Sequence, residues 1–217
     1  MVNILMYISC GLIILSIIIY LILILVYRST IVSKSNGFDV CKDIISEYNS
    51  INIIESKGYI SFYNIKRKII KLDSKTYYGK DLSSITLALL EAGMSILDDN
   101  KEKSIGLFGR IVSNLKMLYL LPMLSLVFNS MFYSVADSKI GIVLLIVFCF
   151  VMFVIIDIKT KIYNWLCDDL KKIKDINKDN RLKIMNFINM IISLDKLILV
   201  GETIMIIRFV MIILGFN

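Results

Sequence analysis

Histidine is absent from all 217 residues of this chain. Serine and cysteine triads normally use an imidazole as their general base, so the absence disfavours that class of hydrolase. It also means that no imidazole anywhere in the chain can serve as a metal ligand. Cysteine is scarce and contains no C-x-x-C pair, which argues against disulfides and against a cysteine zinc site. The four cysteines are Cys10, Cys41, Cys149 and Cys167.

Proline occurs once, and glycine forms no phosphate-binding loop. Gly79 and Gly93 are isolated, so nothing in the sequence indicates a nucleotide site. Two pairs of carboxylates, Asp98–Asp99 and Asp168–Asp169, are adjacent in sequence. Adjacent side chains diverge on a helix, and solvated helix ends explain these pairs better than acid–base catalysis does.

Apolar residues are abundant, with 57% hydrophobic content and a mean hydropathy of +0.76. A membrane-spanning helix needs roughly 20 consecutive apolar residues. We therefore predict an α+β integral membrane protein that forms a single domain, 1–217, with about four spanning helices and a small cytoplasmic helix–sheet part. The first helix is expected to be an uncleaved signal anchor. The four apolar stretches are about Ile4–Val26, Met117–Ala136, Ile140–Ile156 and Leu197–Phe216.

The formal charge of +7 is unevenly distributed along the chain. Fourteen of the 25 basic residues lie in Arg28–Lys116 and nine in Lys159–Lys196. By the positive-inside rule, these polar regions are expected in the cytoplasm, with both termini and the Asp137–Lys139 turn outside. Such a face would attract anionic membrane lipid, and the charge gives no reason to expect nucleic acid as a partner.

The polar regions show periodicities of short helices and strands. Asp81 is a plausible N-cap of a helix, because its side chain can accept from the first free amides. The expected elements are a helix at Phe38–Tyr48, a hairpin of Tyr59–Tyr63 with Lys68–Leu72, a loop at Tyr77–Lys80, a helix at Leu82–Leu97, and helical segments at Ile158–Lys174 and Arg181–Ser193.

Four segments carry a resemblance to a known family. Tyr63–Asp73 is followed by Tyr77-Tyr78-Gly79-Lys80-Asp81 and then by Leu90-Glu91-Ala92-Gly93-Met94-Ser95, while Ile156–Lys161 comes later. In order and spacing they resemble the bacterial membrane-bound neutral zinc metallopeptidases of the H-E-x-x-H type. The resemblance implies a zincin-like cytoplasmic domain behind an N-terminal anchor. It also implies a zinc site with two histidines and a later carboxylate as ligands.

The zinc-ligand positions themselves differ from the family pattern. Leu90 and Met94 stand where the two histidines belong, Glu91 stands at the general base, and Asp157 at the third ligand. Leucine has no lone pair, and a thioether suits Cu(I) better than Zn²⁺. Without a metal, a water beside Glu91 keeps a pKa near ~15.7 instead of ~7. We therefore expect no cofactor and a catalytically inactive homologue, with Leu90 and Met94 serving as ordinary packing residues.

Glu202 and Arg208 lie within the fourth apolar stretch. A charge at the centre of a membrane helix costs roughly 2.5–3.5 kcal/mol on insertion scales. We expect at least one of them to contact another helix or subunit, although a tilted or short helix with an outward-reaching Arg208 explains them as well.

Three functions stay open from the sequence. The first is an inactive metallopeptidase homologue that binds a peptide, a membrane protein or an active relative, in part by strand addition at a sheet edge. The second is an active hydrolase with a nonstandard site around Glu91 and Asp157. The third is a purely structural subunit of a membrane complex, with contacts through Glu202 and Arg208.

Overall fold

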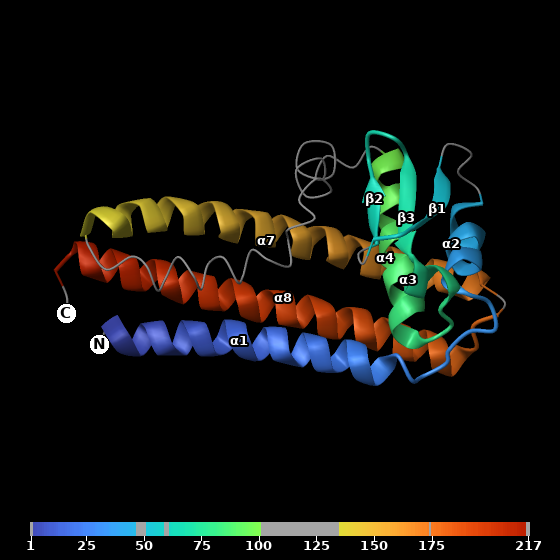
Figure 1. The fold of residues 1–217 in the computed structure, drawn as a ribbon, viewed down its shortest axis with the longest axis horizontal. Helices are drawn as coiled ribbons and strands as arrows, with labels where there is room; N and C mark the ends of the chain where they lie inside the picture. The colour runs from blue at the N-terminus through green and yellow to red at the C-terminus, as the bar shows by residue number, and fades with distance from the viewer. Residues whose placement is uncertain (1, 47–50, 59–60, 101–134, 174, 216–217) are drawn as a thin grey trace. The chain divides into compact units, whose positions relative to one another are not determined.

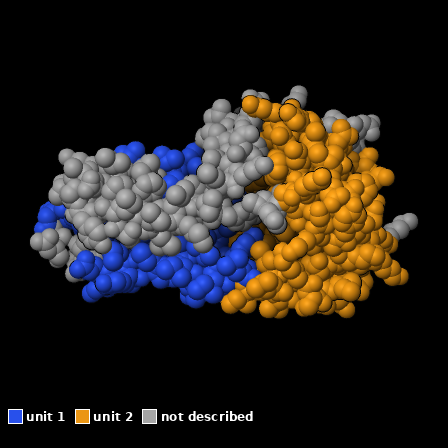
Figure 2. Space-filling model, in the orientation of Figure 1, with its two compact units in different colours: residues 1–21, 117–156, 193–217 blue, residues 22–116, 157–192 orange. Residues whose placement is uncertain are grey.

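The computed structural model describes residues 2–46, 51–58, 61–100, 135–173 and 175–215 (Figure 1). The described chain is mostly helical with one three-stranded sheet. It divides into two compact units, one of residues 1–21, 117–156 and 193–217 and the other of residues 22–116 and 157–192 (Figure 2). The elements are α1 (Val2–Tyr27), α2 (Gly37–Ile45), β1 (Asn52–Ser56), β2 (Phe62–Asn64), β3 (Ile69–Asp73), α3 (Ser74–Tyr78), α4 (Leu82–Asp99), α7 (Val135–Asp169), η2 (Leu170–Lys172) and α8 (Lys178–Ile213).

The prediction of four membrane-spanning helices is wrong for the described residues, where only α1 qualifies, over Asn3–Tyr27. A signal sequence near the N-terminus can pass the same test of length and composition. The later apolar stretches belong to helices of 35 and 36 residues, α7 and α8, which continue into charged segments. The C-terminal stretch of α8 also carries Lys196, Glu202 and Arg208. Residues 117–134 of the span expected at 117–136 lie outside the described residues.

The first unit has a small apolar core shared by three helices. Ile13 of α1, Leu145 of α7, and Met205 and Phe209 of α8 are all buried and form one cluster. Most of α1 is nevertheless exposed, including large apolar side chains such as Tyr7 at 69%. The prediction that the whole chain is a single membrane-integrated domain stays a prediction.

The second unit contains the sheet, in the order β1-β3-β2. β2 pairs antiparallel with β3, which confirms the predicted hairpin, and Tyr63 lies opposite Ile70. β1 pairs parallel with β3, so that Ile53 lies opposite Ile70. α4 packs against β2 and β3, where Tyr63, Ile70 and Leu72 are buried. The core of this unit therefore lies between the sheet and α4.

Aspartate caps mark where α3 and α4 begin. Asp81 accepts from the Ser84 amide at 3.0 Å, which confirms the predicted start of α4. Asp73 accepts from the Lys75 and Thr76 amides and so starts the short helix α3. The prediction of a loop from Tyr77 is therefore wrong for its first two residues, because a capping carboxylate at the end of β3 favours a helical turn there.

Candidate functional site

α4 carries three of the residues that the sequence singled out, namely Leu90, Glu91 and Met94. All three are partly buried. Gly93 sets how closely this part of α4 approaches α7, since a Cβ atom at Gly93 would lie 2.5 Å from Cγ2 of Ile162. Because Gly93 has no side chain, α4 can approach Ile162 of α7 this closely.

Glu91 is held by groups from two other elements. The backbone N–H of Tyr63 in β2 donates to its carboxylate, and the ammonium of Lys159 in α7 acts on it electrostatically. Burial is nevertheless the dominant effect and raises the pKa of Glu91 to about 7. Desolvation favours the neutral acid, whereas the N–H donor and the lysine favour the carboxylate. Glu91 therefore changes its ionisation near neutral pH.

A thiol lies near this carboxylate. Cys41 of α2 is completely buried, and burial together with the charge of Glu91 raises the pKa of its thiol well above the usual range. A thiol in such a site stays protonated, and only the thiolate is a good nucleophile or zinc ligand. Cys41 is therefore an inert neighbour of Glu91.

Asp157 lies at the third ligand position on α7 and has a different partner. Its carboxylate forms an ion pair with Lys161 at 3.2 Å, one turn further along the same helix. Both side chains are more than a third exposed, so the pair contributes little to stability. The described partners of Glu91 and Asp157 are thus separate lysines, and the structure does not join the two carboxylates into one cluster.

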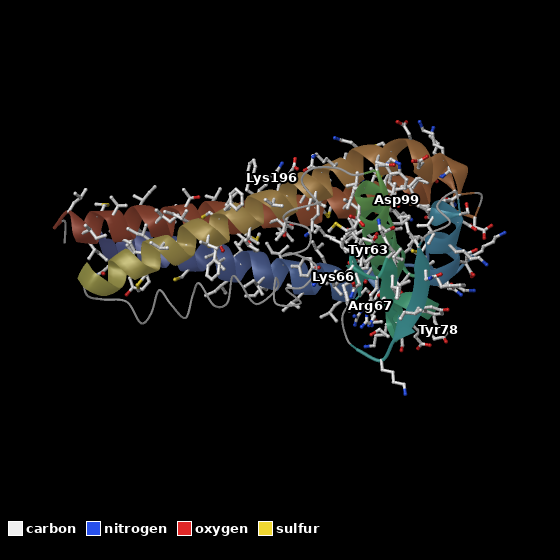
Figure 3. The ribbon with its side chains drawn as sticks, turned by 90° about the horizontal axis from the view of Figure 1, so that it is seen from above. Tyr63, Lys66, Arg67, Tyr78, Asp99 and Lys196 are labelled. Atoms are coloured by element: carbon white, nitrogen blue, oxygen red, sulfur yellow. The ribbon has the colours of Figure 1, made fainter. Side chains whose placement is uncertain are left out.

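Tyr63 also attaches β2 to the C-terminal end of α4. Its hydroxyl donates to Asp98 at 2.8 Å, and Lys68 reaches the same carboxylate at 2.8 Å and that of Asp99 at 3.4 Å. Lys68 has a φ of 52°, a left-handed conformation that closes the β2–β3 turn. Figure 3 shows Tyr63 and Asp99 among these side chains. The adjacent aspartates therefore hold the hairpin in place and are not a catalytic pair.

The residues present do not fit a zinc ion. Tetrahedral zinc sites take nitrogen, thiolate or carboxylate donors, and Leu90 offers none while Met94 offers only a thioether. Glu91 already accepts a backbone hydrogen bond, and Cys41 is held as a thiol. Within the described part of the chain, no three acidic, cysteine or histidine side chains come together as a potential metal site.

Glu202 and Arg208 both lie inside the first unit, with side chains 0% and 2% exposed. The guanidinium of Arg208 lies 5.2 Å from the centre of the Phe209 ring, a cation–π distance. Arg208 therefore does not reach outward as a lone exposed charge. That Glu202 or Arg208 contacts another helix or subunit stays a prediction.

Sequence reasoning missed two neighbours of Glu91. The partner from Tyr63 is a backbone N–H. Residue types cannot reveal such a partner, because every residue except proline carries an N–H. Cys41 was recognised only as part of the apolar face of a short helix.

Comparison with known proteins identifies the family. The model of the family described as "Putative neutral zinc metallopeptidase" matches residues 5–160, well over half of the chain. The matched range includes α4 with Glu91, and Asp157 lies near the end of that range. No curated protein and no solved structure matches. The chain therefore belongs to the putative neutral zinc metallopeptidase family.

Proposed function

We propose that this protein is a catalytically inactive member of its family that acts by binding another protein. One observation carries the proposal: the α4 positions for two zinc-binding histidines hold Leu90 and Met94, and the chain contains no histidine to replace them. The mechanism expected of the family needs a metal to activate water. The residues at these positions do not fit a metal, so no step of that mechanism can be assigned to them.

The surroundings of Glu91 support the same proposal. A general base of a zinc peptidase must face a metal-bound water, with its carboxylate available to take a proton. Here the Glu91 carboxylate accepts from the Tyr63 amide and lies in the field of Lys159. Glu91 thus has a structural role, joining α4 to β2, that does not depend on a metal.

The partner we propose is an extended peptide or a segment of a membrane protein. A sheet edge binds such a segment through main-chain hydrogen bonds, which need no zinc. The apolar helix α1 supports a location at the membrane. The excess of basic residues in Arg28–Lys116 favours a cytoplasmic position for the sheet and an attraction to anionic lipid.

Hydrolysis assays test the proposal. The purified protein should not cleave unstructured substrates such as casein above the rate of the Glu91→Gln variant, with or without added zinc. Glu91→Gln keeps the size of the side chain and an acceptor for the Tyr63 amide, so it serves as a matched variant. Cleavage that depends on Glu91 would instead establish an active hydrolase.

One observation favours that second candidate. A pKa of about 7 would let Glu91 take up and release a proton at physiological pH, as general bases do. Its surroundings weaken the case, because the buried Cys41 thiol stays protonated at that pH and is a poor nucleophile. A hydrolase without a metal would also lack the ion that lowers the pKa of a bound water.

A further inference from the structure

The two edges of the small sheet differ in how many main-chain groups they leave for a partner. In a ladder, alternate residues of a strand point both their N–H and their C=O to the same side. The Asn52 amide donates to the Lys68 carbonyl at 3.0 Å, which fixes the alternation for β1 and β3. With the strand registers given above, each main-chain N–H and C=O group of the three strands then points either to a neighbouring strand or to an open edge.

The β2 edge is short and already occupied. In β2, Phe62 and Asn64 point their main-chain groups toward Lys71 and Ile69 of β3, so that Tyr63 alone faces outward. Its N–H donates to the Glu91 carboxylate. A peptide that paired here would have to compete with the Glu91 carboxylate for this N–H.

The β1 edge has the opposite character. Asn52, Ile54 and Ser56 point toward β3, and Ile53 and Glu55 point away from it. These two residues provide two N–H donors and two C=O acceptors along about 7 Å of strand. Among the described residues, no backbone hydrogen bond outside the ladder uses any of these four groups.

Side chains along β1 indicate the chemistry of a partner. Ile54 is 40% exposed and is on one face of the strand. On the other face, the exposed Glu55 carboxylate accepts from the Ser74 hydroxyl at 2.6 Å and from the Tyr78 hydroxyl at 3.0 Å, with Tyr78 visible in Figure 3. These neutral donors orient the carboxylate and leave its charge for a cation in an added strand.

We infer that β1, and not β2, is the edge at which this protein binds an extended peptide. The inference rests on the proposed function and adds the site and the class of partner to it. The bound segment pairs with Ile53 and Glu55, and has apolar β-branched residues beside Ile54 and a basic residue beside Glu55. Cross-strand apolar and opposite-charge pairs of this kind stabilise a sheet.

A labelled, end-capped peptide of sequence Thr-Val-Lys-Val-Thr tests the inference by fluorescence anisotropy on the full-length protein. The wild type should bind it and should not bind the same peptide N-methylated at every residue. Ile53→Pro removes one outward donor and no ladder bond, and should weaken binding about tenfold or more. Glu55→Gln should weaken it by a smaller factor. The control Asn52→Thr leaves every main-chain donor in place and should bind as the wild type does.

Two results would overturn the inference. One is the absence of binding to the unmethylated peptide. The other is binding that Ile53→Pro and Glu55→Gln both leave unchanged and that Glu91→Ala strengthens, which would assign the peptide to β2. The second result would leave the proposed binding function standing, whereas Glu91-dependent cleavage of the peptide would overturn the proposed function itself.

Discussion

The double variant Leu90→His/Met94→His should bind about one zinc ion per chain, whereas the wild-type protein should bind none. Two imidazoles four residues apart project from the same face of a helix and can share one metal ion. Both positions are only partly buried, so histidine can enter them without filling the core. Elemental analysis after dialysis against trace zinc measures the stoichiometry, and competition with a chromogenic chelator measures the affinity.

Matched variants show whether this metal uses the former site. Leu90→His alone should bind zinc far more weakly, because one imidazole cannot hold the ion. Adding Asp157→Ala to the double variant should lower the affinity if α7 supplies the third ligand. If the double variant binds no more zinc than Leu90→His alone, then the two α4 positions are not the remains of a metal site.

Gly37→Ala should lower the free energy of unfolding by roughly 1–3 kcal/mol, the usual cost of overpacking. A Cβ atom at Gly37 would lie 2.1 Å from the backbone oxygen of Thr76. Main chain cannot turn aside as a long side chain does, so the start of α2 has to move. The Gly37 amide also donates to the Gly79 carbonyl at 2.9 Å, and that movement would strain this bond.

Thermal or chemical unfolding followed by circular dichroism measures the effect. Gly11→Ala in α1 is the matched control, because nothing lies within 4 Å of the added atom. Alanine also favours a helix interior over glycine by about 1 kcal/mol. The control should therefore unfold at or above the wild-type midpoint. A Gly37→Ala variant as stable as the wild type would mean that α2 and α3 are not packed as described.

Local chemistry made part of this fold predictable. The Asp81 cap, the helix after it and the β2–β3 hairpin depend on side chains close in sequence, and all three are present. The parallel pairing of β1 with β3 was not foreseen, because it depends on which strand meets which in space. The alternation of apolar and polar residues shows which face of a strand is buried. It does not show which other strand lies beside it.

The spanning helices show the limit of reading apolar runs. An apolar run predicts where a membrane helix could lie, but it does not fix where the helix that contains it begins and ends. In α7 and α8 the runs are parts of longer helices with charged ends. Among the described residues, α1 is the helix that is long and apolar enough to cross a membrane.

The candidate site was predictable in position but not in its contacts. The helix predicted at Leu82–Leu97 contains Leu90, Glu91 and Met94, and the structure has all three on α4. The resemblance assigned Asp157 to the position of the third ligand, and its described partner is Lys161. The Tyr63 amide beside Glu91 depends on how β2 packs against α4, which residue types do not record.

Zinc content of the purified wild-type protein tests the central claim most directly. The protein should be isolated without chelators, dialysed and measured by elemental analysis beside a protein concentration from amino-acid analysis. We expect far less than one zinc per chain, unchanged in Glu91→Gln and Asp157→Ala. Close to one tightly bound zinc per chain, lost in either of these variants, would contradict the loss of the metal site.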